Sequence, residues 1–93
     1  MCVFNMKEVF GAGNSLPDAG QIFYDAINDA ILTGENIVVD MTGVSSLPSI
    51  FLNVSVGRII EEQGKDVLRA HVTFVKITKQ QAIRLKEYFS RYN

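Results

Sequence analysis

The sequence predicts a single α/β domain over residues 1–93, with a mixed or mainly parallel sheet of three to five strands and about three helices packed on it. Short apolar runs rich in β-branched residues alternate along the chain with longer segments whose apolar residues recur at steps of three and four. The connections between successive strands are long enough to contain a helix, which is how parallel neighbours are joined. With 47% hydrophobic residues, a chain of 93 residues can form one small core.

An extended segment and a helix are expected first along the chain. Residues 2–10, CVFNMKEVF, place polar residues between apolar ones and predict an edge strand or part of a hairpin. A helix then follows, because Ser15 and Asp18 have the spacing of a capping box and Pro17 suits a first turn. Gly34 is expected to end this helix. Its apolar stripe consists of Ala19, Ile22, Phe23, Ala26, Ile27, Ala30 and Ile31.

The middle of the chain predicts a central strand and a second helix. NIVVDM, residues 36–41, is a continuous apolar run bounded by turn residues, which is typical of a strand buried on both faces. A helix is expected over residues 48–63. Because proline disfavours helical geometry in the residue before it, Pro48 is predicted to be the first helical residue and Ser49 the second.

The last third predicts a turn, a strand and a helix. GKD, residues 64–66, is expected to form a turn, and the alternation in HVTFVKI, residues 71–77, predicts a strand. Thr78 and Gln81 have capping-box spacing and predict the start of a helix. Its apolar stripe consists of Ala82, Leu85, Phe89 and Tyr92.

Composition argues against several classes of function. A net charge of −1 does not suit a surface that binds nucleic acid. Cys2 is the only cysteine and His71 the only histidine, so we expect no intrachain disulfide, no metal site and no cofactor. No apolar run approaches the length of a membrane span, and the first residues lack the features of a signal peptide. We therefore expect a cytoplasmic protein without membrane association.

The charge is unevenly distributed along the chain. Residues 1–45 hold one lysine and six acids, a net of −5, whereas residues 46–93 hold eight basic residues and four acids, a net of +4. This distribution suits a dipolar surface that steers a partner or stacks subunits into a homo-oligomer. The alternative is that acidic and basic helices lie on different faces of a solvated domain, and this is the interpretation we favour.

Motifs for nucleotide binding and catalysis are incomplete. GAGNS lies between the extended segment and the first long helix, but the third glycine of a dinucleotide motif would fall on Leu16. Glycines 11 and 13 more simply suit a loop with positive φ. His71, the one candidate base, is far along the chain from the serines near Ser49. The protein is therefore not expected to be an enzyme.

The stretch DMTGVSSLPSIF, residues 40–51, joins the central strand to the second helix and concentrates small polar residues. A phosphate on Ser49 would meet the free N–H groups of the first helical turn and gain from the helix dipole. The alternative is that Ser45, Ser46 and Ser49 only satisfy turn and cap hydrogen bonds, and the residues alone favour this alternative.

The order of elements and the phrase NIVVDMTGVSSLPSIFLNVSVGRII resemble the STAS domain of anti-sigma factor antagonists. Asp40 matches the aspartate at the strand end and Gly43 begins the Gly-Val pair, and both are expected to shape the junction. Ser49 matches the serine that a partner kinase phosphorylates in the antagonists. Pro48 replaces the acidic residue found before that serine, and in this the phrase is closer to the STAS-like family of unknown function, whose members are sometimes fused to histidine-kinase-type ATPase domains.

The resemblance implies a non-enzymatic regulatory module that binds a protein partner, such as an ATPase-type kinase. It implies Ser49 as a phosphorylation switch, with Ser46 as the next candidate. A different hypothesis is a small-ligand or nucleotide sensor that holds an anion at the helix N-terminus near residues 46–50. The partner-binding surface that the resemblance implies consists of Val44, Ser45, Ser46, Leu47, Pro48, Ser49 and Asn53.

Overall fold

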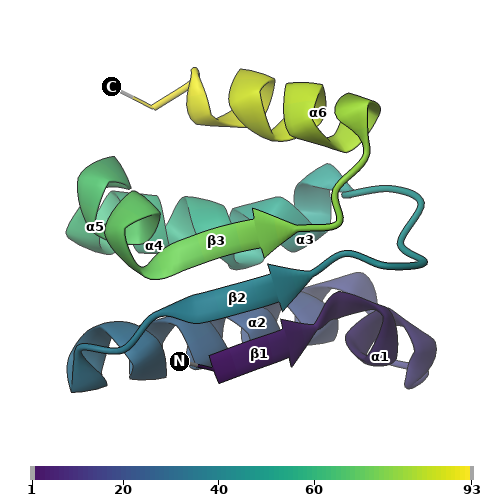
Figure 1. Cartoon of the computed structure of the whole chain (residues 1–93), viewed down its shortest axis with the longest axis horizontal. Coiled ribbons are helices and arrows are strands. Elements are labelled where there is room, and N and C mark those ends of the chain that lie inside the picture. The colour runs from purple at the N-terminus through teal and green to yellow at the C-terminus, as the bar shows by residue number, and fades with distance from the viewer. Residues whose placement is uncertain (1, 93) are drawn as a thin grey trace.

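The computed structural model describes residues 2–92, which form a three-stranded parallel sheet with helices packed on it (Figure 1). Strands β1 (Cys2–Asn5), β2 (Ile37–Asp40) and β3 (Val72–Val75) lie in the order β1-β2-β3. The predicted α/β fold is confirmed: of the predicted alternatives, a mixed or a mainly parallel sheet, the sheet is parallel, and the fold contains more helices than expected. The helices are α1 (Met6–Gly11), α2 (Leu16–Thr33), α3 (Ser49–Val54), α4 (Val56–Gln63), α5 (Lys65–His71) and α6 (Lys79–Phe89).

The topology places helices on one face of the sheet. Both connections lead to the next strand in the same direction, and because such crossovers are almost always right-handed, their helices have to share a face. Figure 1 shows α2, α3 and α4 behind the strands. Ile37 and Val39 point to this side and are buried, whereas Val3 on the other face is 72% exposed. The expected burial of β2 on both faces is therefore wrong, since Val38 and Asp40 are only half-buried.

The N-terminal segment is a short strand followed by a helix. β1 is an edge strand, as one of the two alternatives predicted, and it pairs in parallel with β2 rather than in a hairpin. The extended prediction is wrong beyond Asn5, whose side chain accepts a hydrogen bond from the Glu8 N–H at 3.2 Å and caps α1. Met6 and Phe10 lie one helical turn apart on α1, and Met6 is fully buried.

Helix α2 follows the prediction closely. The Ser15 hydroxyl accepts a hydrogen bond from the Asp18 N–H at 3.3 Å, and Gly34 ends the helix with φ of 72°. In the preceding loop Gly13 has the expected positive φ, but Gly11 does not, because it is the last residue of α1. Neither α2 nor another helix of residues 2–92 is long and apolar enough to cross a membrane.

The helix expected over residues 48–63 is divided into α3 and α4. Ser55 departs from helical geometry, with φ of −107° and ψ of −88°, and its hydroxyl donates to the Phe51 carbonyl at 2.7 Å. Pro48 retains an extended ψ of 145° and is the residue before the helix. The helix therefore begins at Ser49, one residue later than predicted.

Residues 64–66 do not form the simple turn that was predicted. Gly64 ends α4 with φ of 93°, and α5 begins at the next residue. The seven residues of α5 are too few for a clear periodic pattern, and tertiary contacts support them. Leu68 is buried, and the Lys65 ammonium donates to the Tyr92 carbonyl at 2.7 Å, past the end of α6.

Helix α6 begins at the predicted capping box, but the face that it buries differs from the predicted apolar stripe. The Thr78 hydroxyl accepts from the Gln81 N–H, and the Gln81 side chain accepts from the Thr78 N–H. The buried residues are Gln81, Leu85 and Tyr88, whereas Ala82 is exposed. The predicted stripe is therefore correct at Leu85 and wrong at Ala82, because the amide of Gln81 turns inward.

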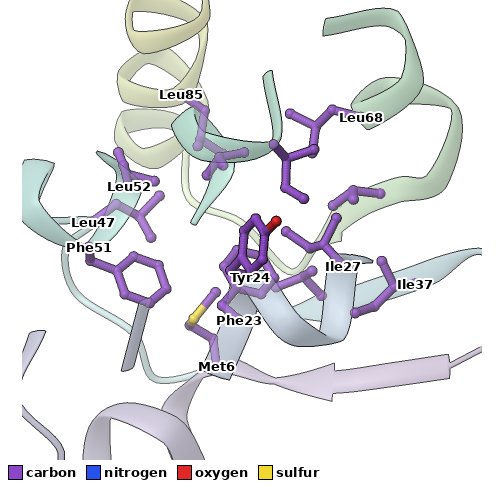
Figure 2. Close-up of a cluster of buried hydrophobic side chains, with 14 of the residues drawn as sticks. Met6, Phe23, Tyr24, Ile27, Ile37, Leu47, Phe51, Leu52, Leu68 and Leu85 are labelled. Atoms are coloured by element: carbon purple, nitrogen blue, oxygen red, sulfur yellow. The ribbon is translucent and has the colours of Figure 1, made fainter. Parts of the chain in front are cut away.

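Aromatic rings from α2 and α3 lie together in the core (Figure 2), and a ring from α1 packs against them. The rings of Phe23 and Phe51 are both fully buried and stack with centroids 5.6 Å apart. Phe10 of α1 packs against Phe51 with centroids 4.8 Å apart, and Phe4 of β1 packs against Phe23 at 4.9 Å. This cluster holds α3, and with it the strand-to-helix junction, against α2 and the sheet.

Candidate functional site

The junction between β2 and α3 begins with a turn that Asp40 organises. The Asp40 carboxylate accepts hydrogen bonds from the Thr42 N–H at 2.9 Å and from the Thr42 hydroxyl at 2.6 Å. These bonds, joined by the Lys76 ammonium 3.8 Å away, lower the pKa of Asp40 below its usual value. Asp40 is therefore a charged residue whose carboxylate holds the turn at Thr42.

Gly43 allows the chain to turn back toward the helices. Its φ is 79°, which favours glycine, and the Val44 N–H donates to the Met41 carbonyl at 3.1 Å. The side chain of Lys7 from α1 packs directly over Gly43, and a Cβ there would lie 2.7 Å from the lysine Cδ. Gly43 thus allows the turn and also leaves room for the side chain of Lys7 to lie against the junction.

Three side chains of helix α6 form hydrogen bonds to the junction and to α3. The Gln81 amide donates to the Val44 carbonyl at 2.5 Å, and Gln81 is 4% exposed. The Arg84 guanidinium donates through Nε to the Leu47 carbonyl at 3.2 Å and through Nη2 to the Ser49 hydroxyl at 2.7 Å. The Tyr88 hydroxyl donates to the Asn53 side chain at 2.8 Å. Each contact joins segments that are distant in sequence, so the junction depends on the docking of α6.

The predicted surface residues occupy different environments. Ser45, Ser46, Ser49 and Asn53 are exposed. Leu47 is only 3% exposed because its side chain is part of the core, so its inclusion among the partner-binding side chains is wrong. Val44 and Pro48 are half-buried.

The serines do not cap α3. Pro48 occupies the capping position and makes no side-chain hydrogen bond to the helix. The Ser49 hydroxyl, on the first helical residue, instead accepts from Arg84. The interpretation of Ser49 as a helix cap is therefore wrong. The sensor hypothesis relied on the dipole of this helix, but α3 has only six residues, and the geometry does not favour that hypothesis.

The loop of residues 41–48, called here the junction loop, lies between two hollows in the surface. One, of about 250 Å³, lies between α1 and the loop and is lined by Lys7, Phe10, Gly43 and Pro48 among others. The other, of about 430 Å³, lies between the loop and α6, where Arg84 forms part of the lining. Ser45 and Ser46 border both hollows, so the loop stands between them with its hydroxyl groups accessible from either side.

The buried end of Tyr88 extends the contact between α3 and α6. Its hydroxyl lies 3.1 Å from that of Tyr92, and both approach Gly57 on α4, where a side chain would collide with them. Burial, together with the hydrogen bond to Tyr92, raises the pKa of Tyr88 above its ordinary value of 10.0. The absence of a side chain at Gly57 therefore leaves room for the two tyrosine hydroxyls.

The raised pKa of Tyr88 predicts a loss of stability at alkaline pH. Above about pH 10 the unfolded chain releases the tyrosine proton while the folded chain keeps it, so the unfolded state becomes favoured as pH rises. We expect the free energy of unfolding from urea titrations to fall as pH rises above about 10, and to fall less steeply in Tyr88→Phe. Equal slopes for the two proteins would contradict this prediction.

The candidate base lies at the other end of the sheet. His71 precedes β3, and its Nδ1 contacts the Glu35 carbonyl at 2.7 Å. Because the strands are parallel, His71 is at their amino ends, whereas the junction follows the carboxyl end of β2. Within residues 2–92, no group of three or more histidine, cysteine, aspartate or glutamate side chains is arranged to hold a metal ion.

Comparison with known protein families decides the classification. The family described as STAS-like domain of unknown function (DUF4325) matches residues 19–82, more than half of the chain. The chain belongs to this family. The matched part of the STAS-like domain runs from α2 to the start of α6 and contains the whole junction. No curated protein and no solved structure matches the chain significantly.

Sequence reasoning missed the residues of α6 that complete the site of this STAS-like domain. Gln81, Arg84 and Tyr88 recur at steps of three and four, which places them on one side of a helix. That spacing was visible, but their partners lie 35 to 37 residues away along the chain. Only the packing of α6 on the junction reveals the pairing.

Proposed function

We propose that this STAS-like domain is a non-enzymatic regulatory module that binds a protein partner, an ATPase-type kinase, beside the β2–α3 junction. The surface for this partner, called here the junction surface, consists of Val44, Ser45, Ser46, Pro48, Ser49 and Asn53. Exposed hydroxyl and amide groups on this surface surround half-buried apolar residues, a mixture that is common at protein interfaces. The two hollows beside the loop give a partner side chain space to enter.

The observation that carries the proposal is the hydrogen bond between Arg84 and Ser49. A guanidinium already directed at an exposed serine hydroxyl is well placed to pair with a phosphate added to that hydroxyl. Such a phosphate would bring about 1.5 to 2 negative charges to the centre of the junction surface. It would also compete with the Leu47 carbonyl for the same guanidinium. Phosphorylation of Ser49 would therefore change both the charge of the surface and the hydrogen bonds by which Arg84 holds it to α6.

The positions of the reactive groups support a binding role rather than catalysis. Ser49 contacts an arginine, which cannot act as a general base at neutral pH because it stays protonated. His71 lies at the opposite end of the strands, as described above. The polar contacts at the junction hold backbone carbonyls and side chains in place, which is what a preformed recognition surface requires.

The proposal is tested by affinity capture from the native cell lysate, with the wild type, Ser49→Ala and Ser49→Asp as baits. Ser90→Asp is the matched control, because it adds the same charge to an exposed serine past the far end of α6. We expect a kinase-type ATPase on the wild-type and control baits, reduced roughly tenfold or more on Ser49→Asp, a difference of about 1.4 kcal/mol. Mass spectrometry of the native protein should find phosphate on Ser49. The proposal fails if Ser49→Asp retains the purified partner as tightly as the wild type.

A further inference from the structure

The outer face of α2 carries an acidic stripe with an exposed apolar centre. The residues at positions 18, 22, 25, 29 and 32 are spaced by four, three, four and three residues. They therefore lie along one side of the helix, opposite the buried side chains of Phe23 and Ile27. Ile22 is 42% exposed and Leu32 is 74% exposed. The acidic stripe consists of Asp18, Ile22, Asp25, Asp29 and Leu32.

The outer face of α6 carries the complementary pattern. Lys79, Ile83 and Lys86 are spaced by four and then three residues, as Asp18, Ile22 and Asp25 are on α2. These three residues, the basic stripe, lie opposite the buried face of α6, and Ile83 is 48% exposed. Each helix therefore presents an isoleucine between two like charges, of opposite sign on the two helices.

The aspartates of the acidic stripe and the lysines of the basic stripe do not form ion pairs with each other within one molecule. In Figure 1, α6 lies beyond β3 at one side of the domain, and α2 lies behind β1 and β2 at the other. The ion pairs found within residues 2–92 join Arg58 to Glu62 and Lys76 to Asp40, and neither involves a stripe residue. The aspartates of the acidic stripe and the lysines of the basic stripe thus lie on different helices at different sides of the fold.

We propose that the basic stripe of one copy docks on the acidic stripe of a second copy. At about 1.5 Å rise per residue, positions seven residues apart are roughly 10.5 Å apart on either helix. Two lysines on α6 can consequently face two aspartates on α2 while Ile83 packs on Ile22. Opposed charges set the register, and contact between the isoleucines removes apolar surface from water.

This contact is heterologous, because it joins different surfaces of the two copies. After two copies dock, one keeps a free acidic stripe and the other keeps a free basic stripe, so association continues into a ring or an open chain. A single pair of helix faces forms a small interface, and exposed ion pairs contribute little individually. The association is therefore weak, reversible and sensitive to salt.

Sedimentation velocity of the full chain tests the proposal at ionic strengths of about 0.01 M and 1 M, where the Debye length is about 30 Å and 3 Å. We expect the average mass to rise with protein concentration at low ionic strength and to return to the monomer at high ionic strength. Lys79→Glu/Lys86→Glu and Asp18→Lys/Asp25→Lys should each remain monomeric, because each double substitution leaves the two stripes with the same sign of charge.

Mixing the two variants provides the decisive comparison. The first variant keeps the wild-type acidic stripe and the second keeps the wild-type basic stripe, so the equimolar mixture should associate again. Arg69→Glu on α5 is the control for Lys86→Glu, because both substitutions change the net charge by the same amount. We expect Arg69→Glu to associate like the wild type, and Lys86→Glu to lower the association constant on the order of tenfold. Circular dichroism verifies that each variant is folded.

The proposal is overturned if the wild type stays monomeric at low ionic strength over the whole concentration range. It is equally overturned if Arg69→Glu and Lys86→Glu weaken association to the same extent, since net charge alone would then be responsible. A mixture of two folded variants that does not associate would also contradict it. None of these results depends on Ser49 or on the junction surface.

Discussion

Phe51→Ala is expected to lower the free energy of unfolding by about 3–5 kcal/mol, the usual cost of removing a buried phenylalanine ring. Phe51 is fully buried, stacks on Phe23 and packs against Phe10, so its removal leaves a cavity where three helices meet. For a chain of this size, that loss is a large part of a total stability of roughly 5–15 kcal/mol. Urea unfolding followed by circular dichroism measures it.

Ile50→Ala is the matched control for Phe51. Ile50 is the preceding residue on α3 and is 55% exposed, so we expect its replacement to change stability by less than about 1 kcal/mol. Phe51→Leu keeps most of the volume and should lie between the two, which gives a measurable value even if Phe51→Ala does not fold. Equal effects at positions 50 and 51 would contradict the described orientation of α3.

Gly20→Ala is expected to destabilise the domain by about 1–2 kcal/mol, although alanine favours helices by nearly 1 kcal/mol over glycine. A Cβ at Gly20 would lie 2.9 Å from the Val54 Cβ and 3.0 Å from the Phe51 carbonyl oxygen. The obstacle includes backbone, so α2 and α3 have to move apart. Overpacking therefore outweighs the gain in helix propensity.

Gly11→Ala tests the opposite case in the same protein. Gly11 is also in a helix, but a Cβ there would meet nothing within 4 Å. We expect this substitution to leave stability unchanged or to raise it by up to about 1 kcal/mol. Thermal or urea unfolding of both variants distinguishes close packing at Gly20 from a general effect of replacing glycine, and a stabilised Gly20→Ala protein would refute the close contact.

The elements that could be predicted from sequence are those with strong local signals. α2 has a serine cap, a left-handed glycine at its end and a long apolar stripe, and α6 has a complete capping box. The apolar run that forms β2 identified the central strand. Each of these signals is contained within a few neighbouring residues, so tertiary structure was not needed to recognise it.

The errors arose where tertiary contacts override a short pattern. Residues 6–11 continue an extended pattern, yet the cap at Asn5 and the burial of Met6 make them helical. Residues 65–71 are too few to show a period, and Lys65 is held by the end of α6. At the site, Ser49 could be chosen from a family phrase, but Arg84 is 35 residues away and becomes its neighbour only in the folded chain.

The break at Ser55 determines how much helix adjoins the junction surface. Because the backbone ladder is interrupted there, α3 is a six-residue segment between Pro48 and Ser55 rather than the first turns of a long rod. The two helices therefore contact the core separately, α3 through Phe51 and Leu52 and α4 through Val56 and Ile59. A phosphate on Ser49, as proposed above, would therefore act on a helix of six residues, whose Phe51 and Leu52 side chains are fully buried in the core.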